Sequence, residues 1–219
     1  MYLYDDNHLN DIEYLLNKDV LFEKIPYMIA QSLTGDYDEG NSYNWAQWKS
    51  FNEDMILGLY IRKMNIEDMK PETCYQDKLD GNLALLCAEI EAHPETQFKI
   101  SIPPYSMLWW DNIYRNGETE SYLYNMEQAM EKLLTYENVE LYYFLNDREI
   151  VTDLDNYMDL LHFSPEINQY ICDSMIRNDH KVTEANCHEI IEDSRSLAYQ
   201  AVNELIKPYE DRIKVDIYD

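Results

Sequence analysis

QFKISIPP (residues 97–104) and VELYYF (residues 139–144) are the two stretches that decide the fold of this chain. Both are short and rich in β-branched and aromatic residues, and the first ends at a proline pair, which cannot continue a central strand. Each follows a segment with apolar residues at helical spacing, residues 80–93 and 118–136. Helix, strand, helix, strand with short connections predicts an α/β fold with a parallel sheet and crossover helices.

The segments outside this alternation predict mainly helices. Residues 1–80 read as a helix-rich and loop-rich region that packs on the core, with a capped helix at 10–16, a second from Asp19 toward Ile29, and a loop at 34–42. Residues 81–219 form the α/β portion, which ends in further helices.

Two capped helices and a short tail complete that portion. Ser164-Pro165 is a capping serine with proline at the first helical position, and it predicts a helix to about residue 177. Thr183 is expected to cap a last helix over 184–206, and residues 212–218 form either an edge strand or a loose end.

Composition excludes several classes of function. The net charge is −26 with only 17 Lys and Arg, which argues against nucleic-acid binding and against docking on an anionic membrane. No stretch is apolar for long enough to span a membrane, and the first residues lack the basic start and apolar run of a signal peptide. The chain as given is therefore expected to be soluble and cytoplasmic, although a native upstream part could precede Met1.

The four cysteines predict neither a disulfide framework nor a metal site. They are widely spaced and form no C-x-x-C pair. Cys87 lies in an apolar helical run, where a buried free thiol is expected. Cys187 and His188 are neighbours that point in different directions on a helix, so no metal and no cofactor is expected.

An Asp-x-x-His pair is the main candidate for chemistry. Asp159 and His162 lie between the last predicted strand and a capped helix, and ligands of open parallel sheets bind at the carboxyl ends of the strands. A carboxylate three residues before a histidine can accept the imidazole Nδ1–H, fix its tautomer and leave Nε2 to act as a base. The alternative interpretation is a capping aspartate beside a structural histidine.

A resemblance to a family rests on these residues. The run 102–110 (IPPYSMLWW), the helix and strand that follow, and residues 156–164 (NYMDLLHFS) resemble the C-terminal half of bacterial SGNH/GDSL-like hydrolases. The nearest group comprises proteins distantly similar to the D-alanyl-lipoteichoic acid protein DltD and to cell-envelope O-acyl esterases or transferases, which are often membrane-anchored and extracytoplasmic. Residues 14–21 also fit that group.

The resemblance implies a variant or incomplete flavodoxin-like SGNH fold with a serine triad. Asp159 would orient His162, and His162 would activate a serine that follows the first strand in a Gly-Asp-Ser or Gly-Ser-Ser turn. Oxyanion donors in the family come from a backbone amide, a glycine and an asparagine. This chain has no such turn, because none of its five glycines precedes a serine as the motif requires. The first strand and its nucleophile are therefore missing.

Other residues of the 102–110 run are weaker candidates. Ser106 is the best remaining serine, although hydrogen bonding within its turn is its more ordinary role. Tyr105, Trp109 and Trp110 could line an acyl or sugar pocket, or they could pack in the core.

Three functions follow from these observations. The first is an esterase or O-acyltransferase domain, a fragment or inactive form, whose substrate is a small-molecule or glycan acyl ester. The second is a non-catalytic binding module that keeps the pocket, and the third is a helical interaction protein in which the Asp-x-x-His pair is structural. Loss of the first strand would expose a strand edge and apolar faces, so repacking, element exchange or a homo-oligomer is expected.

Overall fold

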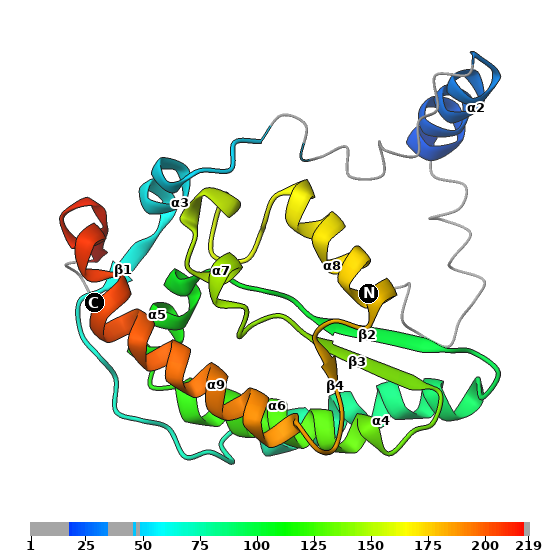
Figure 1. Ribbon diagram of the computed structural model, residues 1–219. Helices are drawn as coiled ribbons and strands as arrows, with labels where there is room; N and C mark the ends of the chain where they lie inside the picture. The colour runs from blue at the N-terminus through cyan, green and yellow to red at the C-terminus, as the bar shows by residue number, and fades with distance from the viewer. Residues whose placement is uncertain (1–17, 35–45, 47–48, 217–219) are drawn as a thin grey trace. The chain divides into compact units, whose positions relative to one another are not determined.

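The computed structural model describes residues 18–34, 46 and 49–216 (Figure 1). The chain forms two compact units, Met1–Trp48 and Lys49–Asp219. In the first, Lys18 and Asp19 are already helical and lead through the π-helical turn η2 (Val20–Lys24) into α2 (Ile25–Thr34). The helix expected toward Ile29 is therefore present, but Asp19 lies within it and does not cap it. The helix expected at 10–16 and nearly all of the loop expected at 34–42 lie outside the described residues.

The second unit contains a three-stranded mixed sheet. Its strands β2 (Phe98–Ile102), β3 (Val139–Tyr143) and β4 (Lys181–Val182) lie in the order β2-β3-β4. β2 and β3 are parallel over their whole length, which confirms the α/β character predicted from the sequence. β4 is antiparallel to β3. Positive φ angles at Asn178 and His180 turn the chain from the preceding helix directly onto the edge of β3.

Helices cover both faces of this sheet (Figure 1). On one side lie α4 (Gln76–Ala92), α6 (Thr119–Leu134) and α9 (Cys187–Gln200), and on the other lies α8 (Pro165–Arg177). α8 begins after Ser164, as expected, although the Ser164 side chain makes no capping hydrogen bond. α4 begins four residues before the expected start at residue 80. α9 begins after Asn186 rather than at Thr183, and it continues into η5 (Ala201–Leu205).

A second, two-stranded sheet joins distant parts of the chain. β1 (Ile61–Lys63) pairs in parallel with β5 (Lys214–Asp216), so the tail is a strand and not a loose end. The short helices α3 (Glu53–Leu59) and η6 (Lys207–Arg212) flank it. These contacts place residues 49–80 in the same compact unit as the α/β portion.

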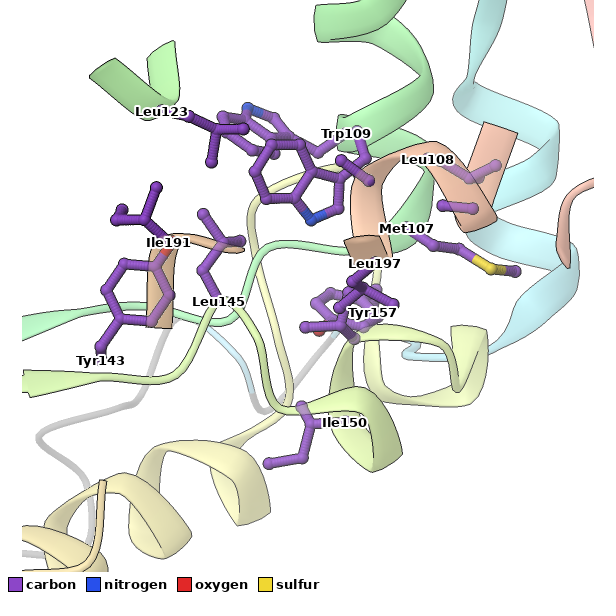
Figure 2. Close-up of a cluster of buried hydrophobic side chains, with 14 of the residues drawn as sticks. Met107, Leu108, Trp109, Leu123, Tyr143, Leu145, Ile150, Tyr157, Ile191 and Leu197 are labelled. Carbon is purple, nitrogen blue, oxygen red and sulfur yellow. The ribbon is translucent and has the colours of Figure 1, made fainter. Parts of the chain in front are cut away.

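The core joins the sheet to α5 (Met107–Arg115), α6 and α9, and Figure 2 shows side chains from each of these elements meeting in one cluster. Trp109 is 8% exposed and Trp110 is fully buried, with Tyr122 against both rings. Leu145 and Tyr157 extend the cluster toward the carboxyl ends of the strands. This rigid layer supports the loops that leave β2 and β3.

The cysteines of the structure are free thiols. Cys87 is buried within α4, as expected, and Cys187 is buried at the start of α9, whereas Cys74 and Cys172 are exposed. Burial raises the pKa of Cys187 to about 11. A thiol with a raised pKa is a poor nucleophile at neutral pH, so Cys187 is an inert core residue.

Candidate functional site

The Asp-x-x-His pair lies at the tip of a short closed loop, residues 157–163. An antiparallel bridge between Tyr157 and Phe163 closes the loop, and Met158 N–H donates to His162 O at 3.1 Å. The segment from α7 (Arg148–Val151) through the 3₁₀ turn η4 (Leu154–Asn156) leads into it from the end of β3. The loop is therefore a fixed hairpin-like turn and not an extended connection.

Asp159 and His162 form the predicted hydrogen bond. Asp159 Oδ2 lies 2.8 Å from His162 Nδ1, and Asp159 Oδ1 accepts the backbone N–H groups of Leu161 and His162 at 2.9 and 2.8 Å. The His162 side chain is 55% exposed and that of Asp159 is 31% exposed. One carboxylate thus fixes both the loop backbone and one nitrogen of the ring, while the imidazole stays accessible to solvent.

These hydrogen bonds act on the protonation of Asp159. Partial burial acts to raise its pKa, but the backbone N–H groups of His162 and Leu161, together with the imidazole, outweigh burial and lower the pKa below its ordinary value. The group is therefore a carboxylate at neutral pH. An ionised Asp159 is the form that can accept Nδ1–H and stabilise a positive charge on the ring.

The loop is anchored to the carboxyl end of β2. Ser106, fully buried at the start of α5, donates its backbone N–H and its Oγ to Leu160 O at 3.1 and 3.2 Å. The Tyr157 hydroxyl donates to Pro104 O at 2.8 Å inside the protein. The segments that leave β2 and β3 therefore meet at this loop, at the edge of the sheet where ligands of parallel sheets bind.

A cavity of about 160 Å³ lies beside Asp159. Leu160, the end of α3 and the start of β1 give it apolar walls, and the Asn112 amide and the Asp159 carboxylate give it polar ones. Its lining residues are Ile56, Leu59, Tyr60, Ile61, Asn112, Asp159 and Leu160. A larger cavity of about 500 Å³ is lined by α4, α6 and Tyr136, with no residue of the 157–163 loop.

A buried ionic cluster lies behind the smaller cavity. Asp111 is fully buried and accepts a bidentate pair of hydrogen bonds from Arg62, at 2.7 and 2.9 Å, and one from the Tyr60 hydroxyl at 2.7 Å. Arg115, one helical turn later in α5, adds a longer contact at 3.2 Å. Burial and the neighbouring Asp111 carboxylate raise the pKa of Tyr60, so its hydroxyl stays protonated. The cluster fixes β1 against α5, and Tyr60 is its one member that lines the cavity.

The other residues predicted from the sequence have different surroundings. Ser106 donates its hydroxyl to Leu160 O, a contact across two segments rather than within its own turn. Trp109 and Trp110 are core residues, which is the second of the two uses that the sequence left open. Tyr105 is half-buried with its ring 5.2 Å from that of Trp109, and burial raises its pKa. None of the three aromatic residues lines the cavity beside Asp159.

A cluster around His180 was not predicted from the sequence. The Tyr170 hydroxyl lies 2.9 Å from Asp147 Oδ2 and 2.8 Å from His180 Nε2, and the His180 ring lies 4.7 Å from that of Phe144. These residues come from α8, the end of β3 and the turn before β4, so no local sequence pattern links them. Their contacts hold α8 against the sheet.

Comparisons with protein-family models, with curated proteins and with solved structures gave no match. Within the described ranges, no three His, Cys, Asp or Glu side chains are grouped so that they could hold a metal ion. No helix of the described part is both long and apolar enough to cross a membrane.

Proposed function

We propose that this chain carries the Asp–His part of an SGNH/GDSL-type serine esterase or O-acyltransferase site that acts on ester-linked acyl groups. The 2.8 Å contact between Asp159 Oδ2 and His162 Nδ1, on a fixed loop at the carboxyl end of a parallel strand pair, is the observation that carries the proposal. The resemblance of residues 102–110 and 156–164 to that family supports it.

In this proposal Asp159 and His162 have different roles. Asp159 accepts the Nδ1–H of His162, so that Nε2 is the basic nitrogen. Nε2 takes the proton of a serine hydroxyl as its oxygen attacks the ester carbonyl, and it then gives that proton to the leaving alcohol. Water or an acceptor hydroxyl, deprotonated in the same way, attacks the acyl-enzyme and releases the acyl group. Asp159 stabilises the imidazolium in both steps.

The serine nucleophile is the member of the triad with the least support in this chain. Ser106 is the serine tied to the loop, but it is buried and its hydroxyl donates to Leu160 O, so its proton is not directed at an imidazole. The family's Gly-Asp-Ser or Gly-Ser-Ser turn does not occur in the sequence. We therefore infer a fragment or inactive form, because the sequence lacks the family's serine turn and the buried Ser106 hydroxyl is bound to Leu160 O.

The cavity beside Asp159 supports a small acyl ester, free or on a glycan, as the ligand. A space of about 160 Å³ is well below the size of drug-sized ligand sites, and its mixed lining suits a short acyl group with one carbonyl. The same cavity favours a second candidate function, a binding module that keeps the pocket without catalysis.

Hydrolysis of p-nitrophenyl acetate by the whole chain tests the catalytic proposal. With Ser106 bound to Leu160 O, His162 should still act as a weak base or nucleophile toward this activated ester. We expect His162→Gln to lower the protein-dependent rate at least about tenfold and Asp159→Asn to lower it by a smaller factor. His93→Gln is the matched control, because the His93 side chain is 53% exposed and that of His162 is 55% exposed.

Equal rates for the wild type, His162→Gln and His93→Gln would contradict the catalytic proposal and favour the binding module. Labelling with a fluorophosphonate, followed by intact mass and peptide mapping, identifies any activated serine. We expect no label that depends on His162. A His162-dependent label on Ser106 would make Ser106 the nucleophile and would show that its hydroxyl leaves Leu160 O.

A further inference from the structure

β2 is the end strand of its sheet, and its outer backbone groups have no strand partner within the described part of the chain. Phe98 N–H donates to Asn138 O, and Phe144 N–H donates to Ile102 O. The backbone N–H and C=O groups of the even-numbered residues of β2 therefore point toward β3. The N–H and C=O groups of Lys99 and Ser101 therefore point away from the sheet, because these groups alternate along a strand. Such an edge is a template for pairing with another strand.

The side chains of β2 do not block this edge. Phe98, Ile100 and Ile102 share one face and are only half-buried, although they border the main core. A charged lysine on an edge strand can prevent pairing with another strand. The Lys99 ammonium, however, lies 3.0 Å from Glu140 of β3, so its side chain points toward β3 and away from the open edge. Ser101 is small and exposed.

α4 carries an exposed stripe on the side that faces away from α6. Residues at positions i, i+4, i+7 and i+11 share one side of a helix, and here these are Lys78, Asn82, Leu85 and Glu89. All four are exposed, and Leu85 in the centre of the stripe is 72% exposed. The opposite side of α4 lines the cavity shared with α6. Figure 1 shows that α4 is the helix of its layer on the β2 side of the sheet. Because the stripe lies opposite the side of α4 that lines the cavity, it forms the outer flank of this layer.

We propose that this flank is the interface of a symmetric dimer in which the β2 strands of two copies pair antiparallel. A two-fold axis at Ile100 places Lys99 opposite Ser101 of the second copy, and both residues have their backbone N–H and C=O groups directed outward. The same register places Phe98 opposite Ile102 of the second copy on the apolar face. The edge is thus complementary to itself, and the two three-stranded sheets become one continuous sheet.

The charges of α4 favour a second copy as the occupant. Ile100 is the middle of β2 and Ala84 is the middle of α4, and β2 runs back along α4 after the connection at residues 93–97. In the proposed dimer, the axis that pairs the strands sets the two α4 helices antiparallel about their centres. That arrangement brings Lys78 of one copy to Glu89 of the other, twice by symmetry, with the two Leu85 side chains between these contacts. In a chain of net charge −26, this flank offers opposite charges and an apolar centre to a copy of itself.

Sedimentation equilibrium of the whole chain over a range of protein concentrations tests the proposal. At physiological ionic strength, where repulsion between two acidic chains is screened, we expect the mass of a dimer. Ser101→Pro removes an outward N–H and leaves the ladder with β3 intact, so it should weaken dimerisation at least about tenfold. Circular dichroism and thermal unfolding of this variant confirm that the monomer is folded.

A charge exchange identifies the helix contact. Glu89→Lys and Lys78→Glu should each weaken the dimer about tenfold, because each change sets like charges against one another twice. The double variant should return to within about threefold of the wild type. Glu184→Lys is the control, because it makes the same change of net charge at an exposed position of the turn before α9 and should not weaken the dimer.

Two results would overturn the proposal. One is a wild-type chain that stays monomeric at every concentration, which would show that the β2 edge does not pair with a second copy of itself. The other is a dimer that Ser101→Pro and Glu89→Lys both leave unchanged, which would place its interface elsewhere.

Discussion

Two carboxylates of this protein hold cationic or basic partners in opposite ways. Asp159 binds an imidazole three residues along the same loop, with both side chains partly in solvent. Asp111 binds a guanidinium from a strand 49 residues earlier, and the carboxylate is fully buried. The first pair is short-range and accessible, which suits chemistry. The second is long-range and inaccessible, which suits the fixing of one element against another.

The largest expected effect comes from breaking the buried pair. Asp111→Ala removes the buried carboxylate that Arg62 and Arg115 share and leaves Arg62 with the more exposed Glu210 carboxylate at 3.2 Å. It should lower the free energy of unfolding by about 3–5 kcal/mol. Asp159→Ala should lower the free energy of unfolding by much less, because the exposed His162 ring can be solvated. Urea unfolding of both variants measures the contrast, and equal losses would show that the two pairs are not different in kind.

The anchor between the two regions should have an intermediate effect. Ser106→Ala removes the Oγ contact to Leu160 O but keeps the backbone contact from the same residue, so a loss of about 0.5–1.5 kcal/mol is expected. Amide exchange in residues 158–163 should become faster. Ser101→Ala, at an exposed serine of β2, is the matched control and should change neither quantity. Slower or unchanged exchange in Ser106→Ala would show that its hydroxyl does not hold the loop.

The smallest expected effect is a pH dependence of the stability that Asp159 contributes. The pKa of Asp159 is lowered in the folded protein, so its stabilising contribution is complete above the unfolded pKa of about 3.9 and is lost as the pH falls through the folded value. The difference in unfolding free energy between the wild type and Asp159→Asn should shrink below about pH 4, where Asp159 becomes protonated. A difference that stays constant down to the acid limit would contradict the hydrogen-bond arrangement of the carboxylate.

The same contrast separates what the sequence could predict from what it could not. The parallel pair of strands, α8 and the Asp-x-x-His contact all depend on local spacing, turn residues and caps, and the structure contains each of them. β1 is three residues long and carries no alternation, and its partner strand lies at the other end of the chain. No local pattern could reveal that pairing, or the contact between Arg62 and Asp111 that depends on it.

Two further features lay beyond local patterns for physical reasons. Trp109 and Trp110 suit either a pocket or a core, and packing against Tyr122 decides for the core. Asn112 lines the cavity beside Asp159 because the fold brings α5 next to the 157–163 loop, where Ser106 at the start of α5 donates to Leu160 O. Side-chain type alone could not choose between these positions.

Nitrogen-15 NMR of the His162 imidazole measures directly whether a carboxylate steers this ring. Above the pKa of the imidazole, the wild type is expected to carry its proton on Nδ1, with a downfield N–H resonance that Asp159→Asn abolishes or shifts. A ring protonated on Nε2, with the same spectrum in both proteins, would mean that Asp159 does not orient His162.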